Sequence, residues 1–431
     1  MSAPDPRPRV AIACQGGGSH TAFTAGVLGR LLRDDVLSKY RVVGLSGTSG
    51  GAICAMLAWS ELIGDDPTRA GKLLRQFWSD NSASTLPEQM MNTFAMWASS
   101  VAHFVLTPEF SPYDIPTSEM ALDHLRGLLT KSVDFATFGA VAGQPQSPRL
   151  FLGAVDVVSG EFKAFDSAEG EITADAVLAS AAIPTLFRSV HEAGGVYWDG
   201  LFSQNPPVRD LLATAPDEIW VIQINAKERG TEPRTILEIA DRRNELSGNL
   251  SLYQELHFIE KIDTMIEDGV LIGGGYKPIT IRIIEMARTA ESQKLGAASK
   301  MNRDPAFLEQ LIEQGEGRAE DFVLALAFEQ AWRSGDADAV VAFFAADCDI
   351  SSEPPFAVLM PQRGKAGVRN FVAAALGRKI RLDLTRKQIS GDRVSWRVRL
   401  PAGADGSAPR GLAEARFASG KIASFRLGPL R

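Results

Sequence analysis

The stretch Gly47-Thr48-Ser49-Gly50-Gly51 lies where an apolar, β-branched run gives way to a run rich in alanine, methionine and leucine. The first run, residues 41–46, predicts a buried strand, and the second, residues 52–62, predicts a helix. Ser49 is then expected on a sharp strand-to-helix turn, where flanking glycines let the strand and the helix pass closely. The N-terminal amides of the helix would point at its hydroxyl. Taken alone, the pattern leaves open a nucleophile elbow or an ordinary strand-turn-helix junction.

The composition is that of a globular protein of 431 residues, which is long enough for two or three domains. A net charge of −7 gives no basic excess for neutralising phosphates, which argues against a general nucleic-acid binder. The three cysteines are far apart and fit neither a metal site nor a disulfide framework, which favours a reducing cytosol. Residues 1–9 are not typical of a secretory signal, and no long apolar run predicts a spanning helix. We expect a cytoplasmic protein, and peripheral contact with the inner membrane surface stays open.

Three consecutive glycines, Gly16, Gly17 and Gly18, follow a short predicted strand and precede a predicted helix. A dinucleotide-binding fingerprint would need a glycine where Thr21 stands, and a Walker A loop would need a lysine. The remaining functional interpretation is a loop whose exposed backbone amides stabilise an oxyanion. A tight turn between strand and helix is the structural alternative.

Residues 89–108 contain no Asp, Glu, Lys or Arg, and large apolar residues recur there at helical spacing. These are Met90, Phe94, Trp97, Val101 and Phe104. A helix that packs this face on the core is the simplest interpretation. A lid or a lipid-facing helix over Ser49 is the alternative, because methionine and aromatic side chains suit adaptable apolar surfaces.

Helices and strands are predicted to alternate through the first two thirds of the chain, which is typical of a largely parallel sheet with helices on its faces. The strands are predicted at residues 10–14, 150–157 and 218–225, and the helices at 21–32 and 174–182. Asp199-Gly200 precedes the last of these strands. Asp-Gly is usually a turn former, but here Asp199 is also placed to lie at the sheet edge that carries Ser49.

Together, the glycine loop, the serine elbow and the later Asp-Gly resemble the patatin-like phospholipases of the bacterial type. The resemblance implies a three-layer α/β/α hydrolase over residues 1–318, including a helical extension from about 227 to 318. Residues 179–187 and Asn205-Pro206 also resemble this family. Two further segments, Arg242-Arg243-Asn244-Glu245-Leu246 and residues 299–317, resemble the extension of one bacterial branch.

By this resemblance, Ser49 is the nucleophile and Asp199 is its base, in a Ser-Asp dyad without histidine. Gly16, Gly17 and Gly18 form the oxyanion loop, and Gly47 and Gly51 flank the elbow. The implied reaction is hydrolysis of a carboxylic ester of a lipid through an acyl-enzyme, as in a phospholipase A or lysophospholipase. We expect no cofactor, and no group of residues has the spacing of a zinc site.

The chain departs from the family pattern after the glycines, where an Arg or Lys is usual and Ser19-His20 stands instead. His20 would supply a positive charge only when protonated, and an unperturbed histidine is mostly neutral at pH 7. A Ser-Asp-His triad in α/β-hydrolase order is the rival mechanism, and His257 is the one histidine after Asp199. It lies in a helical stretch rich in apolar residues, where a structural histidine is expected.

After residue 317 the pattern changes to helices followed by strands. Helices are predicted at residues 320–332, 336–345 and 365–376, a strand at 394–400, and a hairpin at 413–427 that turns at Ser419-Gly420. This order resembles the SnoaL-like α+β cone of the nuclear transport factor 2 superfamily, over residues 319–431. Such cones hold a pocket and often pair. No acid-base set stands out, so a binding or dimerising role is expected.

The main hypothesis is therefore a serine acyl hydrolase acting on a lipid or acyl ester, with the cone as an accessory domain. The alternative is a non-catalytic protein that binds a lipid or acyl group on the same fold. A third hypothesis makes the cone itself the active unit. Peripheral membrane contact and a homodimer through the C-terminal domain stay open, and no nucleic-acid partner is expected.

Overall fold

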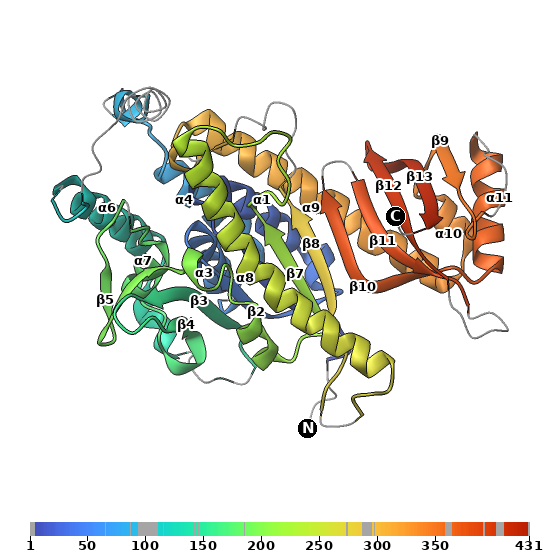
Figure 1. Ribbon diagram of the computed structural model, residues 1–431, viewed down its shortest axis with the longest axis horizontal. Coiled ribbons are helices and arrows are strands. Elements are labelled where there is room, and N and C mark those ends of the chain that lie inside the picture. The colour runs from blue at the N-terminus through green and yellow to red at the C-terminus, as the bar shows by residue number, and fades with distance from the viewer. Residues whose placement is uncertain are drawn as a thin grey trace. The chain divides into compact units, whose positions relative to one another are not determined.

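The computed structural model describes residues 5–64, 66–86, 88–93, 111–114, 116–140, 144, 146–184, 186–272, 275–286, 295–296, 298–357, 364–390, 393–401 and 409–429. Figure 1 shows the arrangement of the elements. The helices are α1 (Ala22–Leu31), α2 (Asp34–Leu37), α3 (Gly50–Leu62), α4 (Ala70–Asp80), α6 (Pro116–Ser132), α7 (Ala174–Ala181), α8 (Ile236–Glu267), α9 (Pro305–Ser334), α10 (Ala337–Val341) and α11 (Gly364–Gly377). The strands are β1 (Arg9–Cys14), β2 (Arg41–Gly47), β3 (Arg149–Asp156), β4 (Phe162–Asp166), β5 (Val190–Glu192), β6 (Gly195–Asp199), β7 (Glu218–Gln223), β8 (Thr280–Glu285), β9 (Phe344–Ser352), β10 (Arg381–Ser390), β11 (Arg393–Arg399), β12 (Arg410–Ala418) and β13 (Lys421–Pro429).

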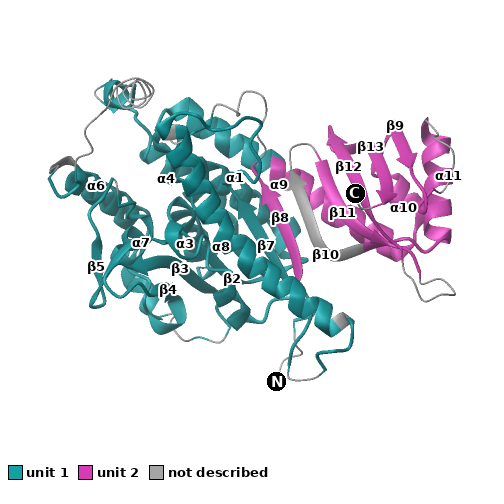
Figure 2. Ribbon diagram, viewed as in Figure 1, with its two compact units in different colours: residues 1–279, 288–317 teal, residues 280–287, 318–431 magenta. Residues whose placement is uncertain are grey.

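The chain forms two compact units (Figure 2). Unit 1 contains residues 1–279 and 288–317, and unit 2 contains residues 280–287 and 318–431. Strand β8 therefore groups with the C-terminal unit, although residues 280–287 were expected to belong to the first domain.

Unit 1 is built on a sheet in the order β5-β6-β3-β2-β1-β7, with β4 also paired to β3. Strands β7, β1, β2 and β3 are parallel, and β4, β5 and β6 are antiparallel to their neighbours. Figure 1 shows α8 crossing one face of this sheet, with α1 and α3 behind it. Both β1 and β7 are buried along almost their whole length, because helices cover both faces of a parallel sheet. The predicted α/β class is confirmed, and the predicted strands and helices of this unit lie within a few residues of those observed.

Unit 2 is a curved sheet in the order β8-β10-β11-β12-β13-β9. Its middle strands are antiparallel, and the predicted hairpin is confirmed, with Ser419 and Gly420 at φ 49° and 72° in the turn between β12 and β13. The helix predicted over residues 336–345 is wrong in its second half. Helix α10 ends at Val341, and β9 begins at Phe344 and pairs in parallel with β13. Sheet pairing overrides the helix preference of the alanines, because β9 thereby buries alternate apolar side chains.

The interior of unit 2 is packed with aromatic rings around Phe328. This ring contacts the rings of Trp332, Phe344, Trp396 and Phe425. One ion pair is buried in the same interior, since Arg282 of β8 contacts Glu329 of α9 at 3.0 Å. Trp396 donates its indole N–H to the same carboxylate at 2.7 Å. Because β8 contributes a buried partner to α9, this strand completes the core of unit 2.

Helices α1 and α9 approach so closely in unit 1 that glycine is required on both. A Cβ on Gly26 would overlap the carbonyl oxygen of Ile312, and one on Gly315 would overlap that of Phe23. A Cβ on Gly317, in the same helix, would meet nothing within 4 Å. The first turns of α9 therefore pack backbone to backbone on α1.

We expect Gly315→Ala to destabilise unit 1 by about 1–3 kcal/mol, because the helices must separate to admit the methyl group. Gly317→Ala is the matched control. It adds the same methyl group to the same helix where there is room, and is expected to be neutral or to stabilise by up to about 1 kcal/mol. Chemical unfolding followed by circular dichroism measures both. Equal effects of the two substitutions would contradict the close packing.

Candidate active site

Ser49 lies between β2 and α3 in a strained backbone conformation. Its φ of 58° and ψ of −133° are unusual for a residue other than glycine and are typical of a nucleophile elbow. A Cβ on Gly47 would overlap the main chain of Gly51, and a Cβ on Gly51 would overlap the carbonyl oxygen of Cys14. These contacts explain why glycines flank the serine.

The elbow is tied to the end of α7 and to β3 through Ser180. The backbone N–H of Ser49 donates to the carbonyl oxygen of Ser180 at 3.0 Å and to its hydroxyl at 3.2 Å. The Ser180 hydroxyl donates in turn to the carbonyl oxygen of Gly153 in β3 at 2.7 Å. The strained turn is therefore held by hydrogen bonds from two neighbouring elements.

Asp199 ends β6 and is brought to the elbow by another glycine contact. A Cβ on Gly200 would lie 2.5 Å from the carbonyl oxygen of Gly153 and 3.0 Å from Cγ2 of Thr48. The Asp199 side chain is buried at 1% exposure, and its Oδ1 accepts the N–H of Leu201 at 2.8 Å. A glycine is thus required after Asp199 because the chain at position 200 lies directly on β3.

The environment of Asp199 raises the pKa of its carboxyl group to about 7. Burial is the main cause, and hydrogen bonding with the Ser49 side chain and the Leu201 amide opposes it. Within the described chain, Oδ2 makes no hydrogen bond of ordinary geometry. The contact between Asp199 and the Ser49 side chain is therefore looser than a full hydrogen bond.

The glycine loop lies against the elbow. A Cβ on Gly16 would lie 2.8 Å from Cβ of Ser49, so the loop backbone approaches the serine directly. The N–H of Gly16 donates to Oδ1 of Asn205 at 2.7 Å. This amide, which we expected to stabilise an oxyanion, is thus occupied within the protein. The amides of Gly17 and Gly18 donate to no acceptor among the residues described.

A set of side-chain amides holds the loop in place, and sequence reasoning missed their role. Gln15 accepts the N–H groups of Ile224 and Asn225 at 2.9 and 2.8 Å, and donates to Asn249 at 3.0 Å. Asn225 donates to the carbonyl oxygen of Gly16 at 3.2 Å. Gln15 directly follows the predicted strand 10–14 and Asn225 is the last residue of the predicted strand 218–225, which is the one signal in the sequence that points to them. Nothing in the sequence singles out Asn249 within its helix.

The two histidines considered from sequence are placed away from catalytic roles. His20 is buried at 1% exposure, and its Nε2 hydrogen-bonds with the Ser299 hydroxyl at 2.8 Å. It also packs edge-on against the ring of Phe307. His257 lies on the exposed side of α8. The geometry therefore supports neither a catalytic triad with His257 nor a solvent-exposed positive charge on His20.

Three further observations concern a metal site, a membrane span and the apolar stretch 89–108. Across the described ranges, no group of three or more His, Cys, Asp or Glu residues is placed to hold a metal ion. Within the same ranges, no helix has both the length and the apolar character to cross a membrane. Of the apolar stretch 89–108, residues 94–108 lie outside the described residues, while Met90 and Met91 are exposed.

Comparison with protein families gives two matches that together cover most of the chain. Residues 12–212 match the family model of patatin-like phospholipases, and this segment contains the elbow, Asp199 and the glycine loop. Residues 12–212 form a patatin-like phospholipase domain. The domain belongs to a family of lipid acyl hydrolases. Residues 325–425 match the SnoaL-like domain. Both resemblances expected from sequence are thus confirmed.

Solved structures similar to this chain include NTF2-like proteins of unknown function. One, from Mesorhizobium loti, is 22% identical over 26% of this chain and 92% of its own, with a TM-score of 0.23. Another, from Burkholderia pseudomallei, is 18% identical over 25% and 88%, with a TM-score of 0.22. A putative polyketide cyclase from Sinorhizobium meliloti is 20% identical over 24% and 92%, with a TM-score of 0.21. A search of curated proteins gave no match.

The raised pKa of Asp199 in the patatin-like domain predicts a specific pH dependence of stability. Between about pH 4 and pH 7 the folded protein keeps a proton that the unfolded chain has released, so this carboxyl makes stability fall as pH rises. Asp199→Asn carries no such proton. We expect its free energy of unfolding, relative to wild type, to increase from pH 4 to pH 7 by on the order of a few kcal/mol and then level off.

Asp156→Asn is the control for this measurement. The pKa of Asp156, a half-buried residue, is lowered by hydrogen bonds from the amides of Ser159 and Val158, so this carboxyl is ionised in both states above pH 5. Its substitution is expected to give a difference in unfolding free energy that is constant from pH 5 to pH 8. If Asp199→Asn also gave a pH-independent difference in unfolding free energy, the raised pKa of Asp199 would be contradicted.

Proposed function

We propose that this protein is a serine hydrolase that cleaves a carboxylic ester of a lipid through a Ser49-Asp199 dyad. The observation that carries the proposal is the pairing of a serine in a strained elbow with a buried aspartate whose pKa is about 7. Burial makes that carboxylate a stronger base than an exposed aspartate, so it is suited to accept a proton near neutral pH. The patatin-like domain supports the lipid acyl class of substrate.

The proposed reaction has two steps. Ionised Asp199 takes the hydroxyl proton as Ser49 Oγ bonds to the ester carbonyl carbon, and the tetrahedral oxyanion accepts hydrogen bonds from the Gly17 and Gly18 amides. The intermediate then expels the alcohol, which takes the proton from Asp199. In the second step, Asp199 takes a proton from water, the hydroxide portion attacks the acyl-enzyme, and the fatty acid leaves as Ser49 regains its proton.

The dyad predicts that hydrolysis of p-nitrophenyl acyl esters depends on both residues. We expect Ser49→Ala and Asp199→Asn each to lower kcat/KM by at least about 10³-fold, because each loses the nucleophile or its base. For wild type, kcat/KM is expected to rise with pH and to reach half its maximum near pH 7, as Asp199 loses its proton. Labelling with a fluorophosphonate is expected to require Ser49.

Asp156→Asn, which changes a half-buried aspartate outside the site, is the control and is expected to keep wild-type kinetics. An inert wild type that still binds fatty acid would favour the non-catalytic alternative. Full activity of Ser49→Ala would refute the dyad.

We further propose that unit 1 meets its substrate at a lipid surface through the side chains of Leu86, Met90 and Met91. They are 72%, 67% and 70% exposed, which is high for three large apolar residues within six positions. Residues 88–93 are helical, and exposed methionines on a helix suit adaptable apolar contact. Together with the lipid acyl hydrolase class, this favours a lipid aggregate as the substrate form.

Met90→Gln combined with Met91→Gln is expected to lower activity on a fatty-acid ester dispersed in vesicles by about tenfold, because apolar area is lost from the contact. Activity on a soluble short-chain p-nitrophenyl ester is expected to stay unchanged, since the chemistry is untouched. Val270→Gln is the matched control, because Val270 is 69% exposed and lies on another segment of unit 1. An equal loss on both substrates would contradict a surface role.

For the C-terminal unit we propose an accessory role. Its aromatic rings and its buried Arg282-Glu329 pair serve packing, as far as the described residues extend. A homodimer through this unit stays a prediction. Activity retained by a full-length chain that carries Ser49→Ala would instead favour the cone as the active unit.

A further inference from the structure

The glycine loop is not followed by the Arg or Lys that is usual in the pattern of the family it resembles. His20 stands at that place, and its ring is buried against Ser299 and Phe307. The charge of a neighbouring cation matters, because the oxyanion of the proposed reaction develops a full negative charge within a water-poor site. A positive charge near the loop would therefore have to come from another segment of the chain.

Lys300 lies next to the glycine loop, although it belongs to the last part of unit 1 in the sequence. It lies in the short 3₁₀ helix Ala298–Met301, and its carbonyl oxygen occupies the space that a Cβ on Gly18 would need. Its neighbour Ser299 holds His20. Two successive residues of this segment thus contact His20 and the glycine loop.

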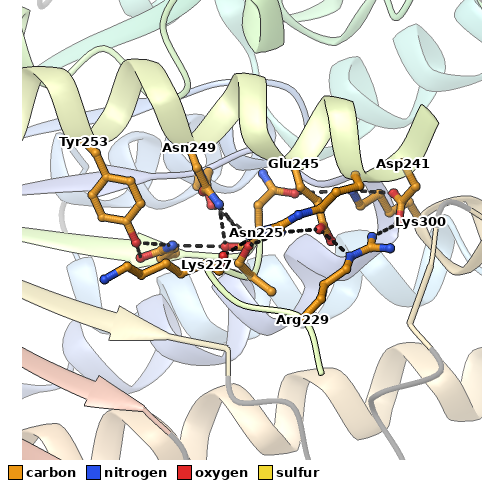
Figure 3. Close-up of polar contacts among 12 residues, drawn as sticks. Asn225, Lys227, Arg229, Asp241, Glu245, Asn249, Tyr253 and Lys300 are labelled. Carbon is orange, nitrogen blue, oxygen red and sulfur yellow. Dashed lines mark hydrogen bonds and ion pairs between the residues drawn. The ribbon is translucent and has the colours of Figure 1, made fainter. Parts of the chain in front are cut away.

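The ammonium group of Lys300 is directed at the loop through Asn225. Its Nζ donates to Oδ1 of Asn225 at 3.3 Å and to Oδ1 of Asp241 at 3.2 Å (Figure 3). Asn225 donates its Nδ2 to the carbonyl oxygen of Gly16 at 3.2 Å. In a trans peptide, the carbonyl of Gly16 and the N–H of Gly17 point in opposite directions. That N–H donates to no acceptor in the described part of the chain.

We infer that Lys300 is a positioning residue that polarises the Gly17 amide through Asn225. Every hydrogen bond in the series runs the same way: from the ammonium to the Asn225 carbonyl, from its amide to the Gly16 carbonyl, and from the Gly17 N–H to the oxyanion. Hydrogen bonds aligned in one direction strengthen one another. The inference rests on the proposed hydrolase function and supplies the cation that position 20 lacks.

Among the described residues, Lys300 belongs to a cluster of ion pairs. Arg229 contacts Asp241 and Glu245, Arg242 contacts Glu245, and Lys300 contacts Asp241. These ion pairs join three cations to two anions. Both carboxylates are almost fully buried, so solvent screens this cluster weakly. Asp241, the carboxylate that contacts Lys300 within the described ranges, also contacts Arg229.

The effect of Lys300 is expected in the transition state, because the oxyanion exists there and not in the bound ester. Lys300→Gln, which removes the charge but keeps a polar side chain, is expected to lower kcat on p-nitrophenyl esters about tenfold or more with KM unchanged. This is less than the 10²–10³ typical of losing an oxyanion donor outright. Lys227→Gln is the matched control, since Lys227 is an exposed lysine near Asn225 whose ammonium lies over the Tyr253 ring.

Restoring the positive charge at position 300 distinguishes polarisation of the Gly17 amide from a merely structural role of the Lys300 side chain. In Lys300→Cys, the new thiolate displaces bromide from 2-bromoethylamine and so regains an ammonium side chain of lysine length. The native cysteines are buried, and burial raises the pKa of Cys54 and Cys348 to about 12 and that of Cys14 well above its usual value. They are therefore expected to resist this reagent, which requires a thiolate.

We expect kcat of Lys300→Cys to be as low as that of Lys300→Gln and to return to at least about half of the wild-type value after aminoethylation. The affinity for a trifluoromethyl ketone, which forms an oxyanion adduct on serine, is expected to fall and recover in parallel. Wild-type kcat in Lys300→Gln, or no recovery in a folded aminoethylated sample, would overturn the inference and leave the dyad standing. If Lys300→Cys does not fold, Lys300→Arg decides: retained kcat supports the inference and a tenfold loss overturns it.

The failure of the proposed function looks different. In that case wild type neither turns over esters nor labels at Ser49, and the inference falls with it.

Discussion

Backbone contacts that leave no room for a Cβ are the constraint on which the site depends. The elbow requires the main chain of Gly51 to lie on that of Cys14, and Asp199 reaches the elbow because Gly200 lies on Gly153. A side chain at Gly51 would push α3 away from β1, and one at Gly200 would push the end of β6 away from β3, so either would displace a proposed dyad residue. The geometry is thus set by close packing of main chain, which is rigid, and not by flexible side chains.

Bringing the carboxyl of Asp199 into this contact places it where ionisation is unfavourable. The same burial that raises its pKa to about 7 makes the charged form destabilising at neutral pH. The hydrogen bond from the Leu201 amide offsets part of this effect, while Oδ2 has no ordinary partner among the described residues. The protein therefore gives up stability at the position where a stronger base is useful, as is common at catalytic sites.

Sequence reasoning identified the parts of the site that local rules determine. Ser49 lies between glycines on a strand-to-helix turn, which is a local rule of this kind. Asp199 was assigned only through the family resemblance, because the contact of Gly200 with Gly153 joins segments far apart in the chain. The supporting residues follow no such rule. Asn205, Asn225 and Lys300 make contacts between segments far apart in the chain, and the local pattern of a single sequence does not show such contacts. The grouping of β8 with the C-terminal unit was missed for the same reason, because it depends on pairing with β10.

The segment Arg242-Arg243-Asn244-Glu245-Leu246, first noted only for its resemblance to a bacterial branch, has a physical role in this fold. Arg242 donates to the carbonyl oxygens of Ala226 and Lys227, which fixes the chain just after Asn225. Glu245 is fully buried and accepts from both Arg242 and Arg229. A buried carboxylate loses far more stability when its partners are removed than an exposed one does. The motif therefore holds the end of β7 in the position from which Asn225 reaches the glycine loop.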